Sequence, residues 1–282
     1  MGGADRGVTL HTATAVRPAP GAELGGTGQA AAAKVAVAGC MAVPEGEAAM
    51  EPRAAPARVA RAVSPGQQEL LRGLQAKGIL DRDTVLQAML LVDRGNYAPC
   101  TASGAEYADR PQPIGHNATI SAPHMHAHAL GLLANHLTPG ARALDVGCGS
   151  GYLSACMAQM VGPKGKVVAI DYLAPLVQLS VSNIKKADGH LLDSGQLVVK
   201  QGDGWKGSPE EAPFDCIHVG AAAESMPEAL VAQLRPGGRM VIPVGTGVQK
   251  YWQVDKTLDG QIVKRALMGV MYVPLVKQGR PA

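Results

Sequence analysis

The stretch from residue 118 to residue 129, ATISAPHMHAHA, holds residue types that often carry out chemistry. Ser121 is followed within seven positions by three histidines, His124, His126 and His128. Two kinds of site use these residue types: a metal centre bound by imidazoles, and a hydrolase in which a histidine activates a serine. The local backbone decides between these sites and a third interpretation, the capped start of a helix.

A metal site with ligands at alternate positions needs an extended backbone, but the sequence predicts a helix here. Pro123 followed by helix-forming residues is typical of a first helical turn, with Ser121 or Ala122 as its cap. No acidic residue lies nearby at ligand spacing, and no H-E-x-x-H motif is present. We therefore expect no metal at this stretch.

The helix also separates the histidines from one another. His124 and His128 would share one face of it, and His126 would point elsewhere. A hydrolase would require a strained turn such as G-x-S-x-G, whereas the residues around Ser121 read T-I-S-A-P. On this stretch alone, a capping serine with packed or solvent-facing histidines and a serine with a functional role both remain open.

A glycine-rich turn, DVGCGSG at 145–151, lies where an apolar strand gives way to a helix. Glycines at such a turn let the backbone pass close beneath a ligand at the helix N-terminus. A dinucleotide site uses the spacing G-x-G-x-x-G. Here the glycines are Gly147, Gly149 and Gly151, so the third glycine comes one residue earlier than that motif requires. Asp145 would repel a pyrophosphate and attract a sulfonium or ammonium cation. The turn therefore favours S-adenosyl-L-methionine, the alternative being a turn that only packs the helix onto the strand.

Acidic residues after the next two strands support a nucleoside ligand. Asp171 ends the strand VVAID twenty positions after Gly151, where a carboxylate reaches ribose hydroxyls in this architecture. The run GDGW at 202–205 follows the third strand, where an acid can reach an adenine amine. A further glycine turn, LRPGG at 234–238, precedes the fifth strand. These features together argue against the packing-only alternative.

Apolar strands alternate with helices from residue 141 onward, which is the pattern of a parallel sheet covered on both faces. We predict a doubly wound α/β domain of the Rossmann-like class with a C-terminal hairpin. The expected strands are 141–146, 166–170, 196–200, 214–219 and 239–244, and the expected helices are 151–161, 173–187 and 226–234. A hairpin and one more strand are expected from 250–256, 261–266 and 268–274.

An N-terminal helical extension is expected ahead of the sheet. The residues SPGQ at 64–67 form a capping box with proline at the first helical position, and Gly78 provides the stop. A second helix is expected to begin near Asp81 or Asp83. Residues 94–123 contain four prolines and are expected to be a loop.

The composition excludes several classes of protein. The 282 residues are 46% hydrophobic and 17% charged, with a formal net charge of +3 and no cluster of Lys and Arg, which argues against a nucleic-acid partner. No apolar run approaches the ~20 residues that cross a bilayer, so no membrane partner is expected. Five cysteines without a CxxC pair fit a reducing compartment, and we expect a cytoplasmic monomer.

Residues 1–64 differ in kind from the rest of the chain. They are dominated by Ala, Gly and Pro, contain no aromatic residue and show no sustained period. Such a segment cannot bury enough apolar surface to offset its ordering entropy, so we predict a disordered arm. The alternative is an organelle transit peptide, because Arg and Ala are common and acids are scarce before Glu45.

The ordered part of the chain resembles protein-L-isoaspartate (D-aspartate) O-methyltransferases. The resemblance rests on QPIG at 112–115 and ATISAPHMHA at 118–127, and covers about residues 65–276. It continues through ALDVGCGSGYLSAC, GKVVAID, VVKQGDGW, EEAPFDCIHVGAAA, LRPGGRMVIPVG and LMGVMYVPL. The glycine turn alone indicates only a superfamily, whereas the serine–histidine stretch together with DCIHVGAAA is specific.

The resemblance implies methyl transfer from S-adenosyl-L-methionine to the free α-carboxylate of L-isoaspartyl and D-aspartyl residues in damaged proteins and peptides, with S-adenosyl-L-homocysteine as product. The ester then closes spontaneously to a succinimide that hydrolyses partly to normal aspartate. A carboxylate with a pKa of ~4 is already ionised at neutral pH, so this nucleophile needs no general base. It needs alignment and loss of its water shell. Ser121 is then the active-site serine that steers the carboxylate.

The resemblance and the glycine turn together assign the site residues. Cofactor contacts are expected at Ala118, Thr119, Ile120, Ser121, His126, Asp145, Gly147, Gly149, Ser150, Asp171, Tyr172, Asp203 and Gly204. The isoaspartyl peptide is expected along Ile114, Gly115, Val219, Gly220, Ala221, Pro243, Val244 and Gly245, largely through backbone groups. Asp145 belongs by position to the methionine end, and ordering the turn through backbone N–H groups is an equally supported role for it. His218 is expected either to donate near the acceptor or to be structural.

Two departures from the family pattern lie near the expected site. Pro113 replaces a small polar residue and removes an N–H donor, and Val276 stands where relatives often have threonine. Two rival functions remain open: a methyltransferase of the same fold with another substrate, and a non-catalytic adaptor that only binds S-adenosyl-L-methionine.

Overall fold

The computed structural model describes residues 62–99 and 104–276, which all lie in one compact unit. The predicted arm at 1–64 lies almost entirely outside the described residues. The strands of the main sheet are β3 (Arg142–Val146), β4 (Lys166–Asp171), β5 (Leu197–Gln201), β6 (Phe214–Val219), β7 (Leu234–Val244), β8 (Gln249–Lys256) and β9 (Ile262–Val270). The helices that the next paragraphs place are α1 (Pro65–Ala76), α2 (Asp83–Leu91), α3 (Pro123–Leu133), α4 (Tyr152–Val161), α5 (Ala174–Ala187), α6 (His190–Asp193) and α7 (Glu228–Ala232).

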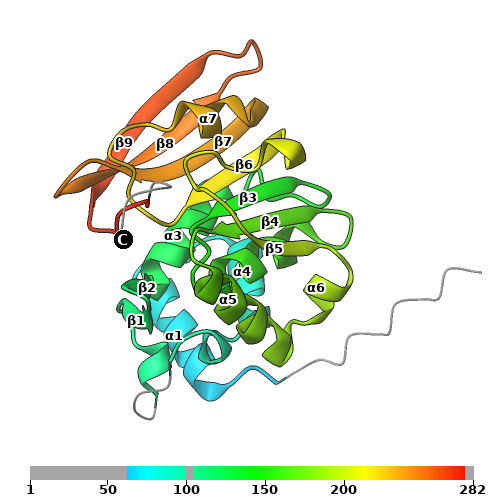
Figure 1. Ribbon diagram of the computed structural model, residues 1–282. Helices are drawn as coiled ribbons and strands as arrows, with labels where there is room; N and C mark the ends of the chain where they lie inside the picture. Colours follow the sequence, from blue (N-terminus) through cyan, green and yellow to red (C-terminus); the bar gives the residue numbers. More distant parts are fainter. Residues whose placement is uncertain (1–61, 100–103, 277–282) are drawn as a thin grey trace, which may run out of the picture. The chain divides into compact units, whose positions relative to one another are not determined.

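The seven strands form one sheet in the order β5-β4-β3-β6-β7-β8-β9 (Figure 1). The strands from β3 to β7 are parallel to their neighbours, and β8 and β9 are antiparallel. The chain runs from β3 outward to β5 and then returns to place β6 on the other side of β3. The strand order therefore reverses between β3 and β6, where ligands bind in open α/β sheets. The predicted doubly wound α/β fold is confirmed.

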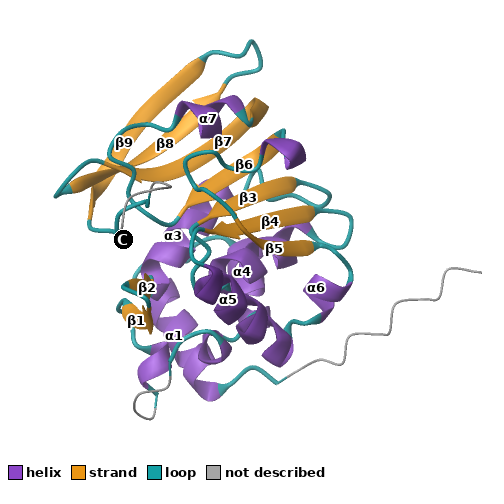
Figure 2. Cartoon of the chain, in the orientation of Figure 1, coloured by secondary structure: helices purple, strands orange, loops and turns teal. Residues whose placement is uncertain are grey.

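Each face of the sheet has its own apolar core. On one face, the side chains of Ala143, Val167 and Cys216 are fully buried with residues of α2, α3 and α4. On the other face, Leu144 and Ile217 pack with α7 and with the strand residues beside it. Figure 2 shows α4 and α5 together on one side of the strands and α7 on the other. Burial on both faces explains why these strands read as continuous apolar runs.

The capped start of α1 is only partly as predicted. The Ser64 hydroxyl accepts a hydrogen bond from the backbone N–H of Gln67 at 3.3 Å, as the capping box requires. The Gln67 side chain does not return to the cap; its amide donates to the carbonyl oxygens of Met89 at 2.6 Å and Val92 at 3.2 Å. Gln67 is fully buried. Its amide therefore stabilises the fold more by donating to the carbonyl oxygens at the end of α2 than it would by bonding back to the N-cap of α1.

The loop predicted at 94–123 contains short regular elements, so that prediction is wrong in part. Two 3₁₀ turns, η1 (Arg94–Asn96) and η2 (Ala105–Tyr107), precede a hairpin of β1 (Gln112–Gly115) and β2 (Ala118–Ile120). The hairpin turns at His116 and Asn117, whose φ angles are +52° and +55°. Two positive φ angles are what a two-residue hairpin turn needs, and Asn tolerates them. The prolines in this stretch had led us to predict a loop in place of the hairpin.

The predicted C-terminal strands also need correction. Residues 261–266 and 268–274 were expected as two strands, but β9 is continuous and pairs with β8 as a hairpin. The segment after it, 271–276, forms no strand of the sheet and has only an isolated bridge, between Pro274 and Ala222, among its β-type pairings. The expected "one more strand" is therefore absent from the part of the chain that the structure describes.

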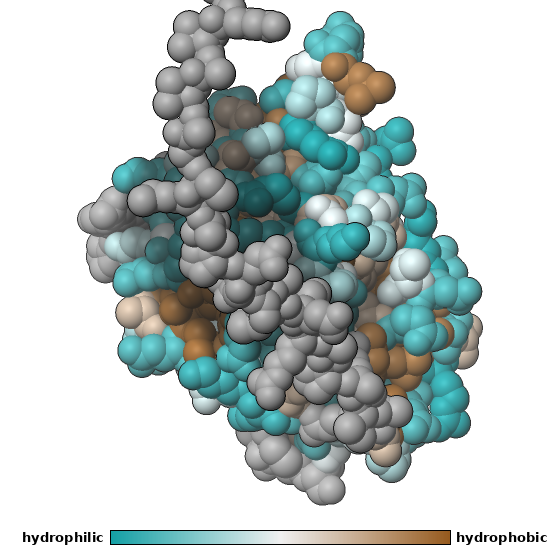
Figure 3. All heavy atoms as spheres, turned by 90° about the vertical axis from the view of Figure 1, so that its right-hand side faces the viewer, coloured by the Kyte–Doolittle hydropathy of each residue, from teal (hydrophilic) through white to brown (hydrophobic). Residues whose placement is uncertain are grey.

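Within residues 62–99 and 104–276, no helix is both long and apolar enough to cross a bilayer. On the face that Figure 3 draws, the atoms that are not grey are mostly hydrophilic, and hydrophobic residues form separate patches.

Candidate functional site

A cavity of about 470 Å³ opens at the edge of the sheet where the strand order reverses between β3 and β6. Its lining includes Gly147 after β3, Asp171 at the end of β4, Gly204 after β5 and Gly220 after β6. Parallel strands bring these carboxyl ends to one edge, and the reversal between β3 and β6 leaves room between the loops. The cavity therefore gathers four segments that are far apart in the sequence.

The glycine turn forms the floor beside β3. Gly147 and Gly149 have φ angles of +76° and +53°, which a residue with a side chain rarely adopts. The Gly147 N–H donates to the Ile170 carbonyl oxygen at 2.8 Å, so the turn is anchored to β4. Gly151, also at positive φ, precedes α4, whose N-terminus therefore faces the ligand side of the sheet. The sequence pattern of glycines is explained by this left-handed turn.

Asp171 connects the turn to the start of the next helix. One carboxylate oxygen accepts from the Gly149 N–H at 3.0 Å and the other from the Leu173 N–H at 3.1 Å. The side chain is 7% exposed, and burial raises its pKa although the backbone hydrogen bonds act in the opposite direction. A carboxylate oxygen can accept more than one hydrogen bond, so Asp171 can still bind hydroxyl groups from the cavity.

Asp145 lies beneath the turn and is only 1% exposed. Its carboxylate accepts from the Ser154 hydroxyl at 2.5 Å and is 2.8 Å from Nδ1 of His218. Asp145 is not among the residues that line the cavity, and these two side chains, rather than backbone N–H groups, are its partners. The structure thus gives both Asp145 and His218 a role in joining β3, α4 and β6, with the negative charge held just behind the glycines.

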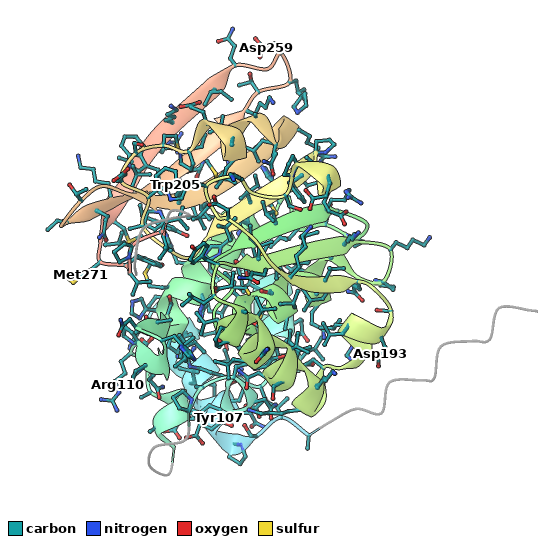
Figure 4. The ribbon with its side chains drawn as sticks, viewed as in Figure 1. Tyr107, Arg110, Asp193, Trp205, Asp259 and Met271 are labelled. Atoms are coloured by element: carbon teal, nitrogen blue, oxygen red, sulfur yellow. The ribbon has the colours of Figure 1, made fainter. Side chains whose placement is uncertain are left out.

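The loop after β5 forms a third side of the cavity. Asp203 accepts from the Trp205 N–H at 3.0 Å and lies 3.8 Å from the ammonium of Lys206. The Trp205 indole N–H donates to the Leu275 carbonyl oxygen at 3.1 Å, and both residues line the cavity. Figure 4 labels Trp205 among the side chains beside β6 and β7. The tryptophan and the leucine supply an apolar wall next to the acidic loop.

Ser121 follows β2 and precedes α3. The helix cap is Ala122 and makes no side-chain hydrogen bond, so Ser121 does not cap α3. The Ser121 carbonyl oxygen accepts from Nη2 of Arg94 at 3.0 Å. Arg94 is fully buried, its Nε donates to the Glu106 carbonyl oxygen at 2.9 Å, and burial lowers its pKa to about 10. The guanidinium remains charged at neutral pH, and its hydrogen bond to the Ser121 carbonyl oxygen holds the backbone of the loop between β2 and α3.

The three histidines of α3 have separate surroundings. His124 contacts Asp109 at 2.8 Å at the surface, as an ion pair when the imidazole is protonated. His126 is buried, with Nδ1 3.4 Å from Nη1 of Arg94, and burial followed by this positive neighbour lowers its pKa. His128 lies near Tyr251. His126 is separated from the other two as predicted, but His124 and His128 also have different neighbours. Among the described residues, no group of three His, Cys, Asp or Glu is suited to a metal.

The opposite wall of the cavity comes from segments near the C-terminus, of which the sequence had indicated only Gly245 and Val276. Residues 245–247, Gln249 and 273–276 all contribute to the lining. The last of these segments is held by Ala222, whose N–H donates to the Val273 carbonyl oxygen and whose own carbonyl oxygen accepts from the Leu275 N–H, both at 2.8 Å. Val276, noted as a departure, is part of this wall.

Comparison with known proteins decides the family. The family model described as "Protein-L-isoaspartate(D-aspartate) O-methyltransferase (PCMT)" matches residues 65–280. The chain belongs to the protein-L-isoaspartate (D-aspartate) O-methyltransferase family.

Individual members of this O-methyltransferase family agree closely with the chain. Protein-L-isoaspartate O-methyltransferase 2 of Arabidopsis thaliana is 48% identical over 216 residues, covering 76% of this chain and 69% of its own. The Caenorhabditis elegans enzyme is 48% identical over 212 residues, covering 74% and 92%. A Plasmodium falciparum protein-L-isoaspartate O-methyltransferase, solved in complex with S-adenosyl-L-homocysteine, aligns with a TM-score of 0.69 at 38% identity, covering 75% and 99%.

The structure brings many, but not all, of the predicted O-methyltransferase site residues to the cavity. The predicted residues in its lining are Ala118, Thr119, Gly147, Gly149, Asp171, Tyr172, Gly204, Gly220, Ala221 and Gly245. The predicted residues outside its lining are Ile114, Gly115, Ile120, Ser121, His126, Asp145, Ser150, Asp203, Val219, Pro243 and Val244. Most of the second group are sequence neighbours of lining residues, and their cofactor and substrate roles remain predictions.

Several residues of the lining were missed by sequence reasoning. His116, Asn117, Trp205, Glu224, Thr246 and Gln249 belong to it. The GDGW run contained the signal for Trp205, because a large aromatic residue directly after a ligand-binding loop can pack on a flat ring. The remaining five lie on turns or, for Gln249, at the start of β8, and no local pattern reveals how close these positions come to the glycine turn.

Proposed function

We propose that this protein transfers the methyl group of S-adenosyl-L-methionine to the free α-carboxylate of L-isoaspartyl and D-aspartyl residues in damaged proteins. The membership of the family supports this, together with a glycine-floored cavity beside a serine loop. The observation that carries the proposal is this juxtaposition, at the switch point of the sheet, in a chain of this family. The products are S-adenosyl-L-homocysteine and a methyl ester that can cyclise to a succinimide.

The cavity residues fit an adenosyl sulfonium. A Cβ built on Gly204 would meet Cδ1 of Leu275 at 2.7 Å and Cγ1 of Val146 at 2.8 Å, so the site depends on glycine at this position. A Cβ on Gly220 would meet the Gly147 carbonyl oxygen at 3.0 Å. Glycine at both positions therefore lets the loops after β5 and β6 pack closely against their neighbours at the edge of the cavity.

The polar groups divide between the two ends of the donor. Asp171 would accept the ribose hydroxyls, and Asp203 would accept from the adenine amine beside Trp205. The glycine turn would hold the methionine end, with the buried negative charge of Asp145 behind it. Bound S-adenosyl-L-methionine supplies an electrophilic methyl group on a positively charged sulfur. A cavity whose lining contains Asp171 and Glu224 but no Lys or Arg suits that cation.

The acceptor requires orientation rather than a base. An α-carboxylate is already ionised at neutral pH, so the reaction needs no general base. The Ser121 hydroxyl would donate to one carboxylate oxygen and leave the other aimed at the methyl group. Gly220, Ala221 and Gly245 would meet the peptide through backbone groups. Recognition of backbone rather than flanking side chains allows many damaged proteins to serve as substrate.

A peptide pair tests the proposal. The full chain is incubated with radiolabelled S-adenosyl-L-methionine and either an isoaspartyl peptide or its normal aspartyl twin, and base-labile label is counted. We expect labelling of the isoaspartyl peptide alone. Equal labelling of both peptides would indicate another methyltransferase activity, and binding of S-adenosyl-L-homocysteine without labelling of either would indicate an adaptor. Either of those results refutes the proposal.

A further inference from the structure

Arg94, the first residue of η1, has a fully buried side chain. Its guanidinium forms no ion pair with an Asp or Glu of residues 62–99 and 104–276. Burial of a charge that no carboxylate neutralises costs free energy, and an apolar side chain that filled the same space would stabilise the fold more. Stability alone therefore does not explain an arginine at this position.

The guanidinium joins three segments around the serine loop. Its Nε donates to the Glu106 carbonyl oxygen of η2 at 2.9 Å, and its Nη2 donates to the Ser121 carbonyl oxygen at 3.0 Å. Its Nη1 lies 3.4 Å from Nδ1 of His126 on α3. Arginine can only donate, so Nδ1 accepts in the neutral imidazole, and burial lowers the pKa of His126 in agreement with that state. One planar group thus holds η2, the serine loop and α3 together.

The arginine is itself held in place from both ends. Its backbone N–H donates to Oε1 of Gln67 at 3.3 Å, and Gln67 is bonded through its amide to the end of α2. Its Cζ lies 5.7 Å from the centroid of the Tyr152 ring, within the range of a cation–π contact. The guanidinium therefore has little freedom to move, and its hydrogen bonds transmit that rigidity to the residues that accept them.

Ser121 is the accepting residue next to the cavity. It is half-buried between Ile120 and Ala122, each of which is 2% exposed, and Thr119 two positions earlier lines the cavity. The hydrogen bond from Arg94 fixes the peptide group that follows Ser121, and β2 fixes the one that precedes it. With both peptide groups fixed, the Cα–Cβ bond that carries the serine hydroxyl has one direction.

We propose that Arg94 is a positioning residue for methyl transfer, which holds the Ser121 carbonyl oxygen and thereby aims the Ser121 hydroxyl at the acceptor carboxylate. The proposal rests on the proposed function, because that function supplies the carboxylate. Arg94 is not among the residues that line the cavity, so it acts through the serine. Loss of its planar fork should disturb alignment in the reaction and leave the binding of the methyl donor intact.

The substitution Arg94→Lys tests this role, because it keeps a positive charge but removes the fork. A single ammonium group cannot reproduce the three directions in which the guanidinium donates. We expect kcat for an isoaspartyl peptide to fall by roughly 5- to 100-fold, the range for displacement of an aligned group by up to about 1 Å. The dissociation constant of S-adenosyl-L-homocysteine, measured by titration calorimetry, should stay within about 2-fold of wild type.

Arg239→Lys is the matched control, because Arg239 makes the same kinds of bond at the other end of α3. Its Nε donates to Asp255 at 2.6 Å, and its Nη1 donates to the Leu132 carbonyl oxygen at 3.0 Å. This variant should lower the melting temperature, as Arg94→Lys does, but keep the wild-type kcat. A similar loss of kcat in both variants would show that the loss follows stability, and it overturns the proposal.

A double-mutant cycle shows whether Arg94 acts through the serine hydroxyl. In a Ser121→Ala background, Arg94→Lys should change the rate by less than about 2-fold, because the aimed group is gone. A full-sized effect in that background, or wild-type rates in Arg94→Lys alone, overturns this inference but not the proposed function. Wild-type protein that binds S-adenosyl-L-homocysteine but does not label the isoaspartyl peptide overturns both.

If Arg94→Lys does not fold, the wild-type protein answers the same question. Nuclear magnetic resonance of protein with isotope-labelled arginine, saturated with S-adenosyl-L-homocysteine, reports on the side-chain N–H groups of Arg94. A carboxylate bound to the Ser121 hydroxyl changes the surroundings of the peptide group that Arg94 holds. An isoaspartyl peptide should therefore shift the Arg94 signals and leave those of Arg239 unchanged. Unchanged Arg94 signals with the peptide bound overturn the inference.

Discussion

Replacement of Asp171 by Asn isolates the charge that we place against the ribose. The substitution keeps the shape but leaves one oxygen in place of two. In the structure each carboxylate oxygen accepts a backbone N–H, from Gly149 at 3.0 Å and from Leu173 at 3.1 Å. The Asn amide group must then face one of these N–H donors, and one hydrogen bond is lost.

Two effects of Asp171→Asn on the ligand-free protein oppose each other. An unsatisfied buried N–H costs about 1–3 kcal/mol. The neutral side chain no longer suffers the desolvation that raises the pKa of this 7% exposed carboxyl group, which offsets part of that cost. We therefore expect the free energy of unfolding to fall by no more than about 2 kcal/mol.

Donor binding has no such compensation. Hydrogen bonds from ribose hydroxyls to a charged acceptor contribute about 1.5–3 kcal/mol, so the dissociation constant for S-adenosyl-L-homocysteine should rise roughly 10- to 100-fold. Titration calorimetry measures this, with thermal melting as the check on folding. Asp193→Asn on α6 is the control, since Figure 4 shows that exposed residue far from Trp205. A folded Asp171→Asn protein with wild-type affinity would refute the assignment.

Three further results are expected. Because burial raises the pKa of Asp171, the ionised form that accepts hydroxyls is lost as the pH falls, at a higher pH than for an ordinary Asp, and calorimetry from pH 8 downward should show affinity for S-adenosyl-L-homocysteine declining before pH ~4; a flat profile contradicts this. Gly204→Ala places Cβ 2.7 Å from Leu275, so the free energy of unfolding measured by urea denaturation should fall by about 1–3 kcal/mol and the affinity for the methyl donor should also fall. An unchanged denaturation midpoint would mean that Leu275 moves aside at no cost in stability. Ser154→Ala removes a 2.5 Å hydrogen bond to buried Asp145 and should lower the free energy of unfolding by about 1–3 kcal/mol without changing the peptide preference; equal stability would show that His218 alone satisfies the carboxylate.

The local sequence predicted the parts of the site that depend on backbone conformation. The glycines at 147 and 149 adopt the positive φ angles that only glycine adopts readily, so the pattern was visible without a structure. Asp171 is placed by the end of an apolar strand, which periodicity identifies. Pro123 marked the start of α3, and Ala122, one of the two expected caps, is its N-cap residue.

The predictions failed where long-range partners outweighed local signals. Gln67 was expected to complete a cap, but a buried amide with two carbonyl partners at the end of α2 is the more stable arrangement. Asp145 was expected to order the turn by accepting from backbone N–H groups, but its partners are the side chains of Ser154 and His218. In both cases a buried polar group bonded to partners that no local pattern contains, because burial makes each unmet hydrogen bond costly.

The amino-acid sequence by itself determined the α/β class, the glycine turn and the family resemblance, since each follows from periodicity or from backbone conformations within a few residues. Only the tertiary structure decided that Arg94 holds the Ser121 carbonyl oxygen and that residues 273–276 close the cavity. These contacts depend on strand order, which is set by how both faces of the sheet bury their apolar side chains. That is a property of the whole sheet, and no single segment contains it.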